Sequence, residues 1–196
     1  MSTSVRPARH EVRSAVIHAA TELFRRQGYA ATTLDQVAAA AGFTKGAIYS
    51  NFGGKPELLA AAAALWFAGR AGSEVRAAAL LGGERSDQLA RQLADIVVTD
   101  TWSRLMNEFR AVAQGDPAVA EIYAEVRHEQ HRQLAEELRL SRGGLGLRDD
   151  ADHEAAARLL LTVISGLAME HAIAPQTTTR AVVEATMEQL LRGLRP

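Results

Sequence analysis

The stretch of sequence that decides the fold runs from Thr33 to Lys55 and reads TLDQVAAAAGFTKGAIYSNFGGK. Thr33 can cap the start of a helix with its hydroxyl, and Gln36, three residues further on, completes a capping box. These two residues predict a short helix over residues 34–41. That helix is mostly alanine, so it can lie close to a neighbouring element.

A second short helix is expected after a tight turn. Gly42 ends the first helix, and Thr44 is a further N-cap candidate for a helix over residues 45–50. The glycines at 53–54 form another turn, and Pro56 suits the first position of a new helix. Two helices joined in this way, with flanking helices, form a helix-turn-helix.

Apolar side chains at helical spacing continue on both sides of this motif. Before it, they predict a helix that begins at Glu11 and ends at Gly28. After it, they predict helices over residues 56–80, 86–114, 117–140, 152–174 and 177–194, with a loop over 141–149. The helix over 152–174 is apolar all round from Leu159 onward, which predicts burial on every side. No stretch has a convincing strand period, so we expect an all-α fold.

Composition and charge exclude several classes of protein. The chain has 196 residues, of which 47% are hydrophobic and 23% charged, an ordinary globular balance. It has no cysteine, which excludes disulfides, thiolate metal sites and cysteine nucleophiles. The net charge of −1 hides an uneven distribution, because residues 1–55 carry +4 and residues 56–196 carry −5. A basic head on an acidic body suits a nucleic-acid binder that meets phosphate at one end.

Residues 31–59, with Gly28 and Tyr29 before them, resemble the DNA-binding head of the TetR family of transcriptional regulators. The resemblance is specific over about residues 11–60 and general beyond them. One departure is the glycine pair at 53–54, where family members often carry a polar or charged residue, so the turn is looser here. The resemblance implies an all-α protein with an N-terminal three-helix helix-turn-helix head joined to a larger helical ligand-binding and dimerisation body.

The expected domains are a flexible basic arm over residues 1–10, a DNA-binding domain over 11–55, and a ligand-binding and dimerisation domain over 56–196. The resemblance implies a homodimer that binds a palindromic operator in double-stranded DNA. It also implies a repressor released by a small-molecule effector. Residues 1–10 lack the apolar region of a signal peptide, which favours a cytoplasmic protein without a membrane partner.

Several residues of the head are candidates for DNA contact. Thr33 and Thr44 lie at helix N-termini, where free amides attract phosphate, although both hydroxyls could serve only as caps. Gly46 costs about 1 kcal/mol relative to alanine within a helix. Close approach to DNA and close packing on the preceding helix would explain it equally well. Tyr49 could offer its hydroxyl to a phosphate while its ring packs on the head, and a half-buried core tyrosine is compatible with that role.

The second short helix is the one that enters the major groove in such motifs, and Lys55 resembles the family lysine that grips phosphate. The candidate DNA-binding residues are Thr33, Thr44, Lys45, Gly46, Ala47, Tyr49, Ser50, Asn51 and Lys55.

The body supplies candidates for an effector pocket and for a dimer seam. Aromatic, methionine and small polar residues at helical spacing predict a pocket lined by Trp102, Met106, Phe109, Tyr123, Ser165 and Met169, with plain core as the alternative. They favour an apolar or aromatic effector. The all-apolar helix predicts a four-helix bundle with a symmetry mate, through Leu160, Ile164, Leu167, Met187 and Leu191. A monomer with this helix fully central is the alternative.

An enzyme is not expected, nor a cofactor. His128 and His131, with Glu125 one turn earlier, could present metal ligands on one helix face, but no second motif completes a site, and a solvated charged face explains them better. The glycines at 143–146 follow a helix rather than a strand, so they indicate a connector. The alternatives that stay open are a helical protein-interaction module and a constitutive DNA binder without a ligand.

Overall fold

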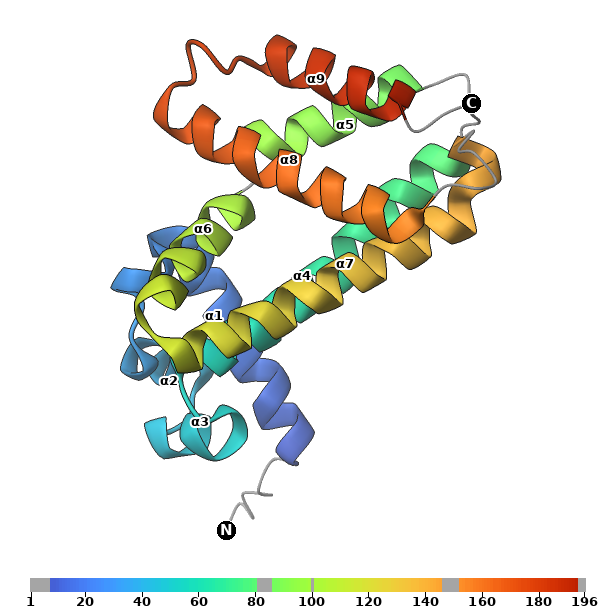
Figure 1. Ribbon diagram of the computed structural model, residues 1–196. Helices are drawn as coiled ribbons and strands as arrows, with labels where there is room; N and C mark the ends of the chain where they lie inside the picture. Colours follow the sequence, from blue (N-terminus) through green and yellow to red (C-terminus); the bar gives the residue numbers. More distant parts are fainter. Residues whose placement is uncertain (1–7, 81–85, 100, 146–151, 194–196) are drawn as a thin grey trace.

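The computed structural model describes residues 8–80, 86–99, 101–145 and 152–193, and within these ranges the chain forms helices and no strands (Figure 1). The helices are α1 (Arg9–Ala31), α2 (Leu34–Ala41), α3 (Lys45–Phe52), α4 (Lys55–Leu80), α5 (Ser86–Thr99), α6 (Thr101–Gly115), α7 (Pro117–Leu145), α8 (His153–Ile173) and α9 (Arg180–Gly193). The predicted all-α class is confirmed. The predicted arm over 1–10 lies mostly outside the described residues.

The head consists of α1, α2 and α3, at one end of the molecule (Figure 1). Gly28 has a φ of 84°, which side chains rarely adopt, and breaks α1 where the sequence predicts its end. Helical hydrogen bonding then resumes as far as Ala31. Gly42 caps α2 in the left-handed conformation, with φ 74° and ψ 26°.

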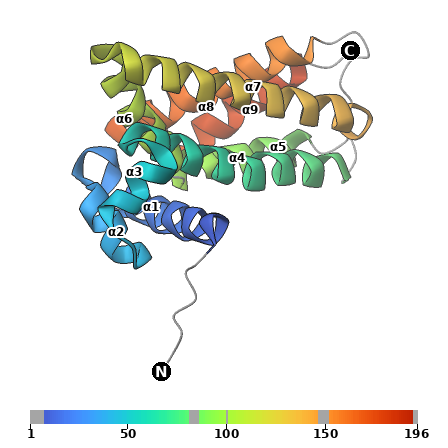
Figure 2. The same cartoon turned by 90° about the horizontal axis from the view of Figure 1, so that it is seen from below.

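The body is built around two long helices, α4 and α7, which run side by side in both Figure 1 and Figure 2. The helices α5, α8 and α9 form a second layer against them, and α6 connects this layer to the head. The α8 helix packs on α5, α6 and α7.

The buried side chains form two clusters. One cluster lies within the body and contains residues of α5, α7, α8 and α9. The other joins head to body, because Val16 and Phe24 of α1 share it with Leu58 of α4 and Phe109 of α6. The predicted boundary after Lys55 therefore runs through a shared core, and the division of the chain into domains stays a prediction.

Two helix predictions need correction. The segment predicted as one helix over 86–114 is two helices, α5 and α6. Their apolar faces serve different cores: Leu89 and Leu93 of α5 pack in the body cluster, whereas Leu105 and Phe109 of α6 pack in the cluster shared with the head. The predicted loop over 141–149 is also wrong at its start, since α7 continues to Leu145, and residues 146–149 lie outside the described chain.

Candidate nucleic-acid interface

The helix-turn-helix is held by two side-chain caps that the sequence predicts. The Gln36 amide donates to the Thr33 hydroxyl at 3.2 Å, and the Gln36 side-chain oxygen accepts from the Thr33 amide at 2.8 Å. The Ala47 amide donates to the Thr44 hydroxyl at 3.2 Å. Both threonines therefore act as caps in this structure, and a phosphate contact at these helix N-termini remains a proposal.

The α3 helix has one buried face and one open face. Ile48 is fully buried in the shared core and anchors the helix. Lys45, Gly46 and Ser50 are exposed, and Tyr49 has 51% of its surface exposed. Tyr49 is therefore outside the buried core of the head. The open face of α3 presents two hydroxyls, an ammonium group and a glycine to an incoming partner.

Gly46 has no packing reason to be a glycine. A Cβ atom added there would meet only the Thr44 hydroxyl, at the ordinary contact distance of 3.8 Å. The neighbouring helix α2 is not in the way, which removes one of the two explanations that the sequence leaves open. Close approach of an external molecule remains.

Lys45 is paired across the turn with a residue of α2. Its Nζ atom lies 2.9 Å from a carboxylate oxygen of Asp35. The hydrogen bond that Lys45 donates to this carboxylate raises the pKa of Lys45. Both side chains are exposed, and such pairs contribute little to stability, so Lys45 can exchange Asp35 for another acceptor at small cost.

Lys55 lies where α4 begins, beside the broken end of α1. Its Nζ atom is 4.3 Å from the centre of the Tyr29 ring and donates to the Ala30 carbonyl at 3.3 Å. Partial burial lowers the pKa of Lys55, and burial raises the pKa of Tyr29 to about 12, with smaller contributions from Glu57 and Asp116. Lys55 is thus anchored on the head, and only part of its side chain faces outward.

Two arginines of α1 belong beside the candidate interface and were not among the predicted residues. Arg13 donates to the backbone oxygen of Asn51 at 3.0 Å and lies 4.6 Å from the centre of the Phe52 ring. Arg9 reaches Asn51 Oδ1 at 3.4 Å and the Ser50 carbonyl at 3.5 Å. They bring positive charge to the C-terminal end of α3, where the helix dipole favours it. The sequence indicates them only through the charge of the head.

Asn51 and Ser50 are also tied to their own helix. The Asn51 side-chain amide donates to the Ala47 carbonyl at 2.7 Å, and the Ser50 hydroxyl donates to the same oxygen at 3.0 Å. Ala47 itself is partly buried. Among the predicted DNA-binding residues, Lys45, Gly46, Tyr49 and Ser50 are brought together on the open face, whereas Asn51 faces α1.

The predicted effector residues do not form one lining. Trp102 stacks on Trp66 with ring centres 5.1 Å apart, and Phe109 contacts Tyr29 at 5.8 Å and Tyr123 at 5.6 Å. These residues and Met106 belong to the cluster shared with the head. The core alternative therefore describes Trp102, Met106 and Phe109. The sequence could not separate these interpretations, because core and pocket residues share the same helical spacing.

The two α8 members of that set lie apart from the aromatic cluster. The Ser165 hydroxyl donates to the carbonyl of Leu161 on its own helix, at 2.7 Å. The Met169 sulfur atom accepts from Arg110 of α6 at 3.4 Å. The charged neighbour of Met169 was not part of the predicted set.

Three of the five residues predicted for the dimer seam are too buried to contact a partner protomer. Leu160, Met187 and Leu191 are buried in the protomer's own core, whereas Ile164 and Leu167 are partly exposed. The sequence shows that α8 is apolar all round but not which face turns inward. An open groove of about 380 Å³ lies between α8 and α9, lined by Leu159, Val163, Thr186, Gln189, Leu190 and Gly193. We place the candidate seam on this groove and its neighbours Ile164 and Leu167.

Comparisons with known proteins agree with this architecture. The family model described as bacterial regulatory proteins, tetR family, matches residues 16–62, and the model described as BetI-type transcriptional repressor, C-terminal, matches residues 83–196. The HTH-type transcriptional regulator SrpR of Pseudomonas putida is 51% identical over 51 residues, which is 26% of this chain and 24% of the relative. The match spans well under half the length of the curated relatives, between 24% and 38%.

Solved structures match over nearly the whole chain. A TetR-family transcriptional regulator from Pectobacterium atrosepticum is 26% identical, with a TM-score of 0.71 and 97% of each chain covered. A transcriptional regulator from Saccharomonospora viridis, solved in complex with choline, is 15% identical, with a TM-score of 0.63, and covers 93% of this chain and 96% of its own. At this identity the second likeness concerns the fold alone.

Proposed function

The chain belongs to the TetR family of bacterial transcriptional regulators, and from this premise we propose that it represses transcription by binding a palindromic DNA operator as a homodimer. A small molecule bound in the helical body releases it. Such a role belongs in the cytoplasm, beside the DNA. It needs neither a catalytic residue nor a cofactor.

The observation that carries the proposal is the open face of α3. Ile48 buries one side of this short helix, and the other side exposes Lys45, Gly46 and Ser50 together. A helix of this kind fits the major groove, where side chains read base edges and a glycine permits close approach. Arg9 and Arg13 add positive charge at its far end, which suits the neighbouring phosphates.

The release step has separate support. The body is far larger than a DNA-binding head requires, and α6 contacts the head directly through Phe109 and Tyr29. By linkage, an effector that prefers the unbound spacing of the heads lowers DNA affinity by its differential affinity for the two states. The regulator from Saccharomonospora viridis, which shares this fold, was solved in complex with choline, and this supports a small-molecule ligand for a protein of this fold.

Selection of DNA from a random oligonucleotide pool, followed by titration at several salt concentrations, tests the DNA-binding step. We expect Lys55→Ala to weaken binding to all sequences and to lower the salt slope by about one, because one phosphate contact is lost. Lys45→Ala should instead relax the preference at particular bases. Arg132→Ala, on the exposed surface of α7, is the matched control.

Unchanged affinity and salt slope in the Lys55→Ala protein would mean that its ammonium group serves only the Tyr29 ring. If Lys45→Ala weakened all operator variants equally, Lys45 would be a phosphate contact rather than a base reader. A wild-type protein without salt-dependent DNA binding would contradict the proposed function and favour a protein-interaction module.

A further inference from the structure

Arg127 of α7 is half-buried and pairs with no carboxylate among the residues that the structure describes. Its Nη1 atom donates to Oε1 of Gln130, a neutral and almost fully buried amide, at 2.9 Å. Burial lowers the pKa of Arg127. Two arginines on the exposed surface of the same helix do pair with carboxylates. A guanidinium nitrogen of Arg132 lies 2.6 Å from a carboxylate oxygen of Glu129, and one of Arg139 lies 2.7 Å from a carboxylate oxygen of Glu136.

This distribution of ion pairs is the reverse of what stability alone favours. An exposed arginine gains little from a partner, whereas a desolvated one needs a counter-charge. Within the described residues, Arg132 and Arg139 have carboxylate partners, whereas the partner of Arg127 is an amide. A binding site for an anion would explain why the half-buried guanidinium is kept available.

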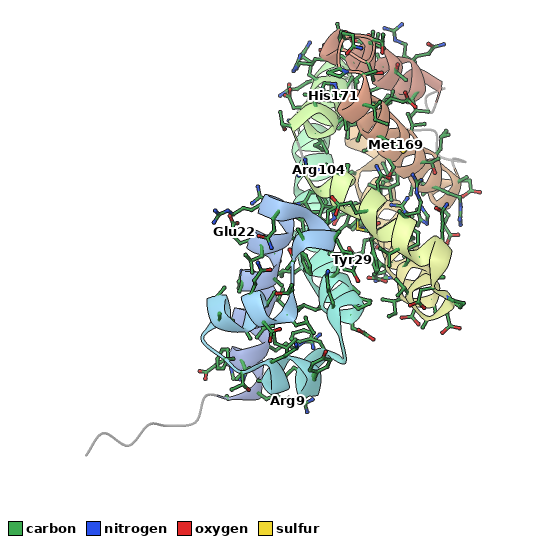
Figure 3. The ribbon with its side chains drawn as sticks, turned by 90° about the vertical axis from the view of Figure 1, so that its left-hand side faces the viewer. Arg9, Glu22, Tyr29, Arg104, Met169 and His171 are labelled. Carbon is green, nitrogen blue, oxygen red and sulfur yellow. The ribbon has the colours of Figure 1, made fainter. Side chains whose placement is uncertain are left out.

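Arg110 of α6 is the second cation of this region. Its Nη2 atom donates to the sulfur atom of Met169 on α8, and a thioether is a weak acceptor. No carboxylate of the described chain pairs with Arg110 either. Its positive charge contributes to the lowered pKa of Arg127, after burial, so the two guanidinium groups act on each other. Figure 3 labels Met169 on the body, away from Arg9 at the far end of the head.

His131 lies one turn beyond Arg127 and adds to the same environment. Its Nε2 atom is buried without a hydrogen-bond partner in the described chain. Burial is the main cause of its lowered pKa, followed by the positive charges of Arg127, Arg158 and His128. The sequence predicted a solvated charged face for His131, and the buried Nε2 atom shows that this prediction is wrong for His131. Arg110 of α6 and Arg127 of α7 thus bring two guanidinium groups to this region, and Arg158 of α8 adds positive charge near His131.

We propose that the effector is an organic carboxylate with an apolar body, and that Arg127 and Arg110 bind its carboxylate between α6, α7 and α8. This proposal rests on the proposed function and names the chemical class of its effector. A guanidinium group matches a carboxylate with two parallel hydrogen bonds. Tyr123 and Met169, beside these arginines, suit an apolar or aromatic remainder. A quaternary ammonium compound would be repelled here.

The site is also placed to affect the head. Arg110 follows directly on two residues of α6 that contact the broken end of α1. Phe109 packs on Tyr29, and Glu108 accepts from the Tyr29 amide at 2.7 Å. An anion that draws Arg110 away from Met169 would therefore act on the helix that touches the head.

Thermal unfolding of the full chain with defined probes tests the proposal. The probes are 2-naphthoate and octanoate, with 2-naphthamide, octanamide, benzyltrimethylammonium and inorganic phosphate as controls. At millimolar concentration, at least one carboxylate should raise the Tm of the wild type by about 3 °C or more. It should raise the Tm of Arg110→Met and Arg127→Met by much less. The other probes should not change the Tm of the wild type or of any variant. Arg132→Met is the matched control and should respond as the wild type does.

Arg110→Met keeps the test valid if Arg127→Met fails to fold, because Arg110 gives up only a thioether contact. The proposal is overturned if neither carboxylate shifts the wild type, if amides or the ammonium compound act as strongly, or if both arginine variants respond fully. An arginine-dependent response to phosphate alone would also overturn the carboxylate assignment and indicate an inorganic oxyanion.

Binding to the selected DNA separates this inference from the proposed function. The effective carboxylate should weaken the DNA complex of the wild type and leave that of Arg110→Met unchanged. An arginine-dependent thermal shift in a protein that binds no DNA would keep the site and contradict the proposed function. Intact DNA binding with no thermal response to a carboxylate would support the proposed function and contradict the carboxylate site.

Discussion

At the scale of single residues, Gly46 separates the demands of folding from those of binding. Its missing side chain leaves open space, since the nearest atom to an added Cβ would be the Thr44 hydroxyl at 3.8 Å. A glycine that packing does not require lowers helix stability, and no contact within the chain compensates for this loss. Glycine at this position is therefore best explained by a molecule that approaches α3 from outside.

The change Gly46→Ala should move stability and DNA affinity in opposite directions. We expect the free energy of unfolding to rise by up to about 1 kcal/mol, because alanine is the better helix former. DNA affinity should fall by about tenfold or more, because the added methyl group holds the helix away from the bases. Urea denaturation and fluorescence anisotropy measure the two effects.

Gly115→Ala is the control for this prediction, since an added Cβ there also meets nothing within 4 Å and the residue lies at the exposed end of α6. It should leave DNA affinity unchanged. Equal affinity of Gly46→Ala and wild type for the selected DNA would mean that no partner approaches α3 closely at this position.

Residue roles were predictable where they depend on near neighbours in sequence. The Thr33 and Gln36 capping box is confirmed because both partners lie within one helical turn. The contact of Lys55 with Tyr29 and the reach of Arg9 to Ser50 depend on residues far away along the chain, which only the fold brings near. That Arg127 has no carboxylate partner among the described residues could not be predicted either, since an arginine in a charged stretch of sequence gives no sign of its burial.

At the scale of helices, the joint between α1 and α6 links head to body. Gly28 interrupts α1 with a φ of 84°, which frees the Tyr29 amide from the helical pattern. A carboxylate oxygen of Glu108 accepts from this amide at 2.7 Å and lies 3.5 Å from the Ala30 amide. A Cβ at Gly28 would lie 2.8 Å from both carboxylate oxygens of Glu108, so the glycine also makes room for this contact. Figure 3 shows Tyr29 at this joint.

Replacing the carboxylate should weaken the joint. We expect Glu108→Ala to lower the free energy of unfolding by about 1–3 kcal/mol, because the partly buried Tyr29 amide loses its acceptor. Glu108→Gln should cost less, since its side-chain oxygen can still accept. Denaturant titration of the full chain measures the difference between the two variants.

Glu22→Ala serves as the control, because Glu22 makes only a long, exposed pair with Arg25 at 3.7 Å on the same helix α1. If Glu108→Ala were no more destabilising than Glu22→Ala, the contact between α6 and α1 would be incidental, and the joint would rest on the Tyr29 and Phe109 rings alone.

Helix positions were more predictable than helix partners. The sequence predicts the extent of α2 and of α8 closely, because caps and apolar spacing are local signals. It misses the division of residues 86–114, because both halves are apolar at helical spacing and only the packing assigns them to different cores. The start of α4 at Lys55 differs from prediction by one residue, which is the usual uncertainty at helix ends, whereas α7 ends at Leu145, well beyond its predicted end at residue 140.

At the scale of the whole molecule, α8 needs more cover than one protomer gives it. By length and composition this helix is apolar enough to cross a membrane, yet it packs on α5, α6 and α7. Its inward face is buried, but Leu159 keeps 45% of its surface exposed, beside the groove between α8 and α9. A symmetry mate that packs on this groove would bury the remaining apolar surface and complete a four-helix bundle.

This arrangement predicts that a charge introduced into the groove has two linked effects: it separates the protomers, and it weakens operator binding. In sedimentation experiments we expect the wild type at twice the chain mass of 21.1 kDa. Leu159→Lys should shift it toward the single-chain mass, with dimerisation weakened by about tenfold or more, because a lysine must lose water at the seam. Leu140→Lys is the matched control, since Leu140 of α7 is also exposed, at 63%, but lies outside the groove.

The same variants connect assembly to DNA recognition. Because a dimer binds both half-sites at once, Leu159→Lys should lose affinity for the palindrome while it binds an isolated half-site as the wild type does. A Leu159→Lys protein that stays dimeric would move the seam to another surface. A wild type found only as a single chain, yet with full affinity for the palindrome, would show that the heads act independently. In that case an effector could not release the protein by changing the separation of the heads.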